Sequence, residues 1–136
     1  MACVVTGRIE IPGEKLSEYL QALEDAEQAA APFRNQLERF NREFERSLQT
    51  KFSARTARKH ASIIEVFIDF VCWQTDVRSI DEITRGIANS SFRKWYRSKT
   101  GEGSDSELKT AVKKFFQFLD REKGITNEAV LKSFQR

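Results

Sequence analysis

Apolar residues recur at helical spacing along most of the chain, and the densest run lies near its middle. Residues 54–74, ARTARKHASIIEVFIDFVCWQ, are apolar almost without a break from Ile63 to Trp73. On a helix, this run covers more than half of the circumference. A helix that is apolar over so much of its surface must be surrounded by other elements. We therefore expect residues 54–74 to form the central helix of a bundle, with Ser53 as its N-cap.

Two narrower apolar stripes precede the central run. Proline inside a helix removes a hydrogen bond and breaks or kinks the helix, so Pro32 is expected to divide this region into a helical hairpin. The second stripe is only about 80° wide, which indicates a seam for one partner helix. That partner is either elsewhere in this chain or a second copy of it. The first stripe contains Leu16, Tyr19, Leu20, Leu23 and Ala26, and the second contains Phe33, Leu37, Phe40, Phe44 and Leu48.

Turn and capping signals divide the rest of the chain. Ser79 with Glu82, and Ser104 with Glu107, match the capping-box pattern of a helix start. Residues 100–105, TGEGSD, are the clearest loop. These signals predict a turn of helix after Ser79 and longer helices over about 84–99, which Thr84 can cap, and 104–123. Gly124 is the expected helix C-terminus, and a last short helix is expected after Thr126 or Asn127. At the other end, alternation of Ile9 and Ile11 with polar residues predicts a short strand over residues 3–11.

Composition favours one folded helical domain, or one domain with an appendage. The chain has 136 residues, of which 40% are hydrophobic and 11% aromatic, which is enough for a real core. No stretch approaches the roughly 20 apolar residues of a membrane span. Its two cysteines are too few for a disulfide framework. We therefore expect a soluble, cytoplasmic, all-α protein with no membrane partner.

Charge is unevenly distributed along the chain. Residues 1–50 contain six basic and nine acidic residues, a net charge of −3, whereas residues 51–136 contain seventeen and eleven, a net charge of +6. We therefore divide the chain into an N-terminal hairpin, 1–50, and a basic bundle, 51–136. The basic segment is the part expected to meet a polyanion.

Basic residues fall on one face of each of three predicted helices. Each face alone is typical of a solvated surface. If the three faces converge after folding, they form a footprint for a phosphate backbone. The candidate DNA-binding residues are Arg55, Arg58 and Lys59 on the first helix, Arg93, Lys94 and Arg97 on the second, and Lys109 and Lys113 on the third.

Catalytic chemistry has little support in the sequence. The single histidine, His60, follows two basic residues and is interpreted as a packing residue rather than a base. No Cys or His cluster has the spacing of metal ligands, and no glycine-rich loop could cradle a phosphate. We expect no catalytic residue, no metal, no cofactor and no small-molecule substrate.

Three motifs stand out in the second part of the chain. Ser53 and Thr56 open a helix that ends in IIEVFIDF, SIDEIT at 79–84 is followed by Ile87, and ELKTAVKKFFQFLDREKGI occupies 107–125. With these motifs, residues 53–134 resemble the core-binding domain of tyrosine recombinases, the phage integrases. This resemblance implies a SAM-like orthogonal bundle of four helices. It further implies a role in DNA integration and recombination, in which this domain grips duplex DNA while a catalytic domain grips the other side.

The chain departs from the family pattern in two ways. The family usually has Asn-Pro where this chain has Asn127 and Glu128. The chain also has no room for the recombinase constellation of Arg, His and nucleophilic Tyr. We therefore expect a non-catalytic DNA-binding domain, although a longer protein containing it could be a recombinase. The alternative is a helical interaction or assembly module with no nucleic-acid partner, which self-associates through the N-terminal seam.

Overall fold

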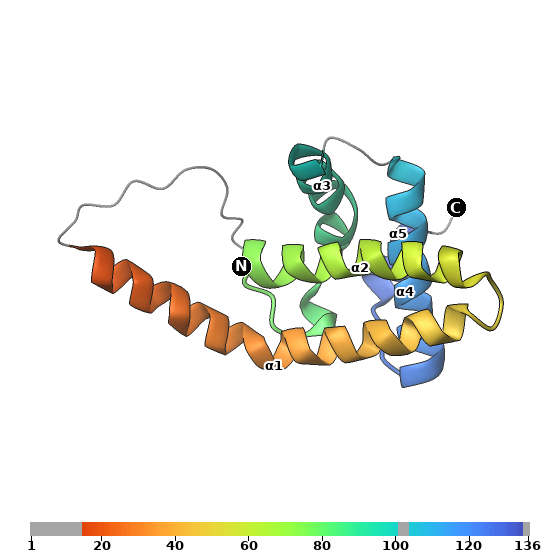
Figure 1. Cartoon of the computed structure of the whole chain (residues 1–136), viewed down its shortest axis with the longest axis horizontal. Helices are drawn as coiled ribbons and strands as arrows, with labels where there is room; N and C mark the ends of the chain where they lie inside the picture. Colours follow the sequence, from red (N-terminus) through yellow and green to blue (C-terminus); the bar gives the residue numbers. More distant parts are fainter. Residues whose placement is uncertain (1–14, 101–103, 135–136) are drawn as a thin grey trace.

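The computed structural model describes residues 15–100 and 104–134, and this part of the chain is all-α, as predicted (Figure 1). The strand predicted over residues 3–11 lies outside the described residues, as do residues 101–103 of the loop predicted at 100–105. A short 3₁₀ helix, η2, and a π-helical turn, η3, precede α3. The elements are α1 Leu16–Leu48, α2 Ala54–Gln74, η2 Ile80–Glu82, η3 Ile87–Ser91, α3 Phe92–Thr100, α4 Asp105–Lys123 and α5 Glu128–Ser133.

The central helix has the predicted position and bounds. Ser53 Oγ accepts a hydrogen bond from the Thr56 backbone N–H at 3.1 Å, which caps the first turn of α2. Ile64 and Phe67 are fully shielded from solvent. α2 packs along the C-terminal half of α1, and α3 and α4 also contact it (Figure 1). It is therefore the element around which the bundle is built.

The predicted division of the N-terminal region at Pro32 is wrong. α1 is one continuous helix of 33 residues with Pro32 inside it. Pro32 is exposed, so water can hydrogen-bond to the carbonyl that its missing N–H leaves unpaired. The alanines at 29–31 have the highest helix propensity, and Phe33 is anchored in the core on the other side. The hairpin is instead formed by α1 and α2, joined by a tight turn at 49–53.

The second apolar stripe of α1 has its partner within the chain. Its residues pack against α2 and α4, and Phe44 illustrates the contact. The ring of Phe44 lies 5.3 Å from that of Phe115 and 5.6 Å from that of Phe118, measured between centroids. All five of its members are buried: Phe33, Leu37, Phe40, Phe44 and Leu48. The stripe is therefore an intramolecular seam.

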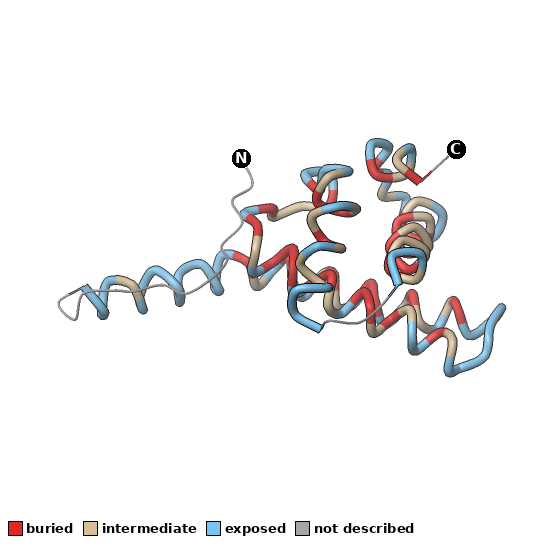
Figure 2. Tube along the Cα trace, turned by 90° about the horizontal axis from the view of Figure 1, so that it is seen from above, coloured by how far each residue is buried: buried red, intermediate tan, exposed pale blue. Residues whose placement is uncertain are grey.

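The first apolar stripe of α1 is not packed against the other described helices. Residues 16–29, which we call the arm, project beyond the bundle and are almost entirely exposed (Figure 2). The side chains of Leu16, Leu20 and Leu23 are 48%, 55% and 41% exposed. The arm contributes nothing to the core, which begins at Ala30.

The C-terminal helices begin and end largely as predicted. Ser104 Oγ caps α4 by accepting a hydrogen bond from the Glu107 N–H at 3.2 Å, and Gly124 ends it in the left-handed conformation with φ of 66°. Thr84 Oγ1 accepts from the Ile87 N–H, at the start of the π-helical turn that leads into α3. After Ser79 the predicted turn of helix forms as a 3₁₀ turn, but the predicted capping box does not, because the Ser79 hydroxyl donates to the Glu82 carboxylate instead of accepting from a backbone N–H.

Asn127 joins the last helix to the centre of the chain. Its Oδ1 caps α5 by accepting from the Val130 N–H, while its Nδ2 donates to the carbonyls of Ile80 and Ile83, both at 2.8 Å. The side chain is buried. All of its bonds are used inside the protein, so Asn127 is a structural residue.

One hydrophobic core extends from Ala30 to Phe134. This core includes residues from both sides of position 50, where the sequence analysis divides the chain into two parts. That division remains a prediction, and so does the SAM-like arrangement of the four helices α2–α5. Among the described residues, no helix is both long and apolar enough to cross a bilayer.

Candidate nucleic-acid interface

The eight basic residues predicted to bind DNA fall into two groups in the structure. Arg58, Lys59 and Arg97 each form an ion pair with at least one carboxylate. The other five form no ion pair within the described part of the chain: Arg55, Arg93, Lys94, Lys109 and Lys113. This difference decides how readily each residue could meet a phosphate.

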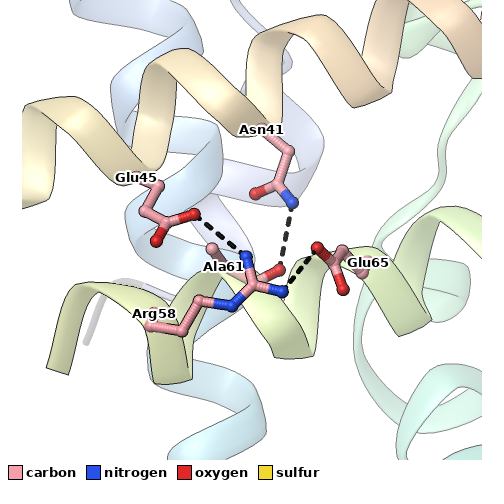
Figure 3. Close-up of polar contacts among 5 residues, drawn as sticks. All are labelled: Asn41, Glu45, Arg58, Ala61 and Glu65. Carbon is pink, nitrogen blue, oxygen red and sulfur yellow. Dashed lines mark hydrogen bonds and ion pairs between the residues drawn. The ribbon is translucent and has the colours of Figure 1, made fainter. Parts of the chain in front are cut away.

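Arg58 is held between two helices by two carboxylates (Figure 3). Its Nη1 lies 3.0 Å from Glu45 Oε1 on α1, and its Nη2 lies 2.9 Å from Glu65 Oε1 on α2. These two hydrogen bonds raise the pKa of Arg58 above its already high ordinary value. A phosphate would have to displace both carboxylates to bind this guanidinium.

The surroundings of Arg58 also disfavour a polyanion. It lines a groove of about 560 Å³ between α1 and α2 that contains four carboxylates and three arginines. In the floor of this groove, Asn41 Nδ2 donates to the Ala61 carbonyl at 3.0 Å, so the polar contacts here join α1 to α2 (Figure 3). The groove is lined by Arg34, Glu38, Asn41, Arg42, Glu45, Arg58, Glu65, Ile68 and Asp69.

Lys59 and Arg97 show that parts of the three predicted basic faces do meet. Lys59 Nζ lies 2.7 Å from Glu107 Oε1, and Arg97 Nη1 lies 3.4 Å from Asp105 Oδ1. These pairs bring the start of α2 and the end of α3 to the first turn of α4. The acidic residues there suit a helix N-terminus, but they also neutralise both cations.

On the third face, on α4, neither predicted cation forms an ion pair among the described residues, whereas Arg58, Lys59 and Arg97 on the other two faces do. Lys109, Lys113, Gln117 and Arg121 follow one another at four-residue spacing and so form a row along the helix. The row extends over about 18 Å. None of its three cations forms an ion pair among the described residues. This row offers positive charge without any protein partner to displace.

A groove beside this row adds two more cations. It lies between α4 and the turn that joins α1 to α2, and its volume is about 350 Å³. In this groove, Lys114 Nζ lies over the Phe52 ring, 4.8 Å from its centre. The groove is lined by Phe44, Ser47, Leu48, Thr50, Lys51, Phe52, Lys114, Gln117, Phe118, Arg121 and Glu122.

A second groove of about 350 Å³ on the other side of the row is lined by Lys113, Gln117, Asp120, Arg121 and Leu131. The two grooves share Gln117 and Arg121, so they meet along α4. We call the five cations Lys51, Lys109, Lys113, Lys114 and Arg121 the α4 basic surface.

Sequence reasoning missed three members of this surface as site residues. Lys114 and Arg121 lie on a helix that was predicted correctly, and the alignment of Arg121 with Lys113 at i+8 could have revealed it. Lys51 lies in a turn, where helical periodicity gives no signal. Its position beside α4 depends on the packing of α1 against that helix.

His60 lies close to this surface. Its pKa is lowered, first by burial and then by the positive charges of Lys114 and Lys59, against a smaller opposing effect of Glu107. Its Nδ1 is buried and has no hydrogen-bond partner. His60 is therefore neutral at pH 7.

The described residues contain no group of three His, Cys, Asp or Glu side chains that could hold a metal ion. Comparisons with family models, curated proteins and solved structures find no match for this chain. The candidate site therefore rests on the geometry described above.

Proposed function

We propose that the chain is a non-catalytic DNA-binding domain that grips duplex DNA through phosphate contacts from the α4 basic surface. The observation that carries this proposal is the absence of carboxylate partners, within the described residues, for all five cations of that surface. The resemblance to the core-binding domain of tyrosine recombinases supports the same class. It implies a role in DNA integration or recombination.

The energetic argument concerns what each cation loses on binding. A lysine that is already paired must exchange a carboxylate for a phosphate, with little net gain. A lysine without a carboxylate partner releases the counterions condensed on DNA and breaks no ion pair when it binds a phosphate. The α4 basic surface therefore has the most to gain from a polyanion, ahead of Arg58, Lys59 and Arg97.

The dimensions of the surface suit a duplex backbone. The row on α4 extends over about 18 Å, which corresponds to about five base pairs of B-form DNA. Phosphate contacts position a protein on DNA but carry no sequence information. We therefore expect binding to depend on charge and weakly on base sequence.

Fluorescence anisotropy with a labelled mixed-sequence duplex at low salt tests the proposal. Lys113→Gln and Arg121→Gln should each weaken binding, and each should reduce the salt dependence by about one phosphate contact. The matched control is Arg39→Gln, because Arg39 is an exposed cation on α1 that lines neither groove of the α4 basic surface. If both α4 variants bind as tightly as the wild type, the proposed surface is wrong.

A second candidate function is protein interaction, and the arm is the observation that favours it. The arm exposes Leu16, Leu20 and Leu23 on one side. It also carries four acidic residues and no basic one, so two arms would repel each other at neutral pH. Light scattering at high concentration tests self-association: a dimer that Leu20→Gln converts to a monomer would support it, and a monomeric wild type would exclude it.

A further inference from the structure

We propose that the groove between α4 and the α1–α2 turn receives one unpaired nucleotide, whose base stacks on Phe52 and whose phosphate is bound by the neighbouring cations. This inference rests on the proposed nucleic-acid binding and adds a ligand class to it. A duplex buries the faces of its bases by stacking, so the ligand of this groove is a single-stranded segment, such as an overhang or a branch next to the duplex.

Phe52 is the exception among the phenylalanines of this protein. All eleven lie in the described ranges, and ten of them are buried, whereas the side chain of Phe52 is 39% exposed. Its backbone is held in the turn after α1, because its N–H donates to the Leu48 carbonyl at 2.8 Å. An exposed aromatic ring on a fixed stretch of backbone is a surface on which a base can stack.

Three cations share the groove with the Phe52 ring. Lys114 Nζ lies over the ring, 4.8 Å from its centre, so a base that stacks on this face displaces the ammonium group toward the phosphate of the same nucleotide. Lys51 and Arg121 line the same groove. Their charge is opposed there by one carboxylate, Glu122. Three cations around an aromatic ring suit a ligand that is both aromatic and anionic, which is the chemistry of a nucleotide.

The floor and size of the groove fit the same ligand. Phe44, Leu48 and Phe118 are buried beneath it and provide apolar contact. A volume of about 350 Å³ is within the range of small-ligand sites. The hydroxyl of Thr50 already donates to the Ser47 carbonyl at 2.7 Å. Because every base has a face that can stack on an aromatic ring, we expect stacking that tolerates any base.

The test compares three probes with the same labelled duplex: a blunt end, a short single-stranded overhang, and the same overhang in which every nucleotide is abasic. The abasic overhang has the same phosphates and no bases, so it isolates stacking from charge. We expect the wild type to bind the base-containing overhang about tenfold more tightly than the abasic one. Phe52→Leu should remove this difference and leave affinity for the blunt duplex unchanged, while Phe52→Trp should keep it.

The outcomes separate this inference from the proposed function. Equal affinity for the two overhangs, or a difference that survives in Phe52→Leu, overturns the stacking site and leaves duplex binding intact. A base-dependent affinity for the overhang without binding to the blunt duplex supports the site and overturns the proposed duplex grip. Binding to none of the probes overturns both. Far-UV circular dichroism confirms that each Phe52 variant is folded.

Discussion

Phe67 lies where α2, α3 and α4 meet. Its side chain is fully buried, and its ring lies 5.0 Å from that of Phe92 and 6.2 Å from that of Phe116. Phe67→Ala should therefore lower the free energy of unfolding by about 3–5 kcal/mol, through lost burial and the cavity left behind. Chemical denaturation measures this directly. A loss of less than about 1 kcal/mol would show that Phe67 is not in the core.

His60 provides a prediction about pH. It is the single histidine of the chain, so its ring protons can be followed by NMR without overlap from another residue. Burial and the nearby Lys114 and Lys59 lower its pKa in the folded state. The titration should therefore have its midpoint below the ordinary value of about 6.5. A midpoint at or above that value would contradict the placement of His60 beside these lysines.

The same shift predicts how stability depends on pH. Between the folded and unfolded pKa values of His60, the unfolded state binds more protons than the folded state. The free energy of unfolding should therefore rise with pH across this window and fall as the pH drops below about 6.5. His60→Gln should remove the contribution of His60 to this pH dependence and leave the contribution of the carboxylates unchanged. If the variant and the wild type respond identically to pH, His60 is not the group responsible.

Among the elements, the starts of α2 and α4 could be predicted from the sequence, whereas the continuity of α1 could not. The bounds of α2 and the start of α4 were predictable because a serine cap precedes each of them. The continuity of α1 was not, because Pro32 is a strong local breaker whose cost is offset by the core contacts that follow it. Likewise, the basic row on α4 was partly predictable from periodicity, whereas the contributions of Lys51 and Phe52 depend on how a turn packs.

The continuity of α1 can be tested at Pro32. Because the helix passes through this exposed position, Pro32→Ala should restore a backbone hydrogen bond and raise the free energy of unfolding by about 1–3 kcal/mol. Denaturation monitored by circular dichroism gives the value. A loss of stability would indicate instead that the chain needs a turn at Pro32.

Two leucines on α1 distinguish the seam from the arm. Leu37 is buried against the bundle, so Leu37→Ala should cost about 2–5 kcal/mol. Leu20 has the same chemistry but lies on the exposed arm, so Leu20→Ala should change stability by no more than about 0.5 kcal/mol. Denaturation of both variants makes the comparison. Equal costs at the two positions would show that the arm is covered in solution.

Across the whole molecule, regions of different charge are separated from one another. The arm is acidic, the groove between α1 and α2 contains carboxylates and arginines together, and the α4 basic surface carries cations without carboxylate partners among the described residues. A polyanion should therefore approach from the α4 side and be repelled by the arm. The modest net charge of +3 conceals this asymmetry.

The salt dependence of binding to duplex DNA tests the central claim most directly. With about five phosphate contacts from the α4 basic surface, the slope of log K against log salt concentration should be about −4.5, and it should be similar for duplexes of different sequence. Fluorescence anisotropy over a series of salt concentrations gives this slope. Failure to bind any duplex at low salt, or a slope near zero, would contradict the account.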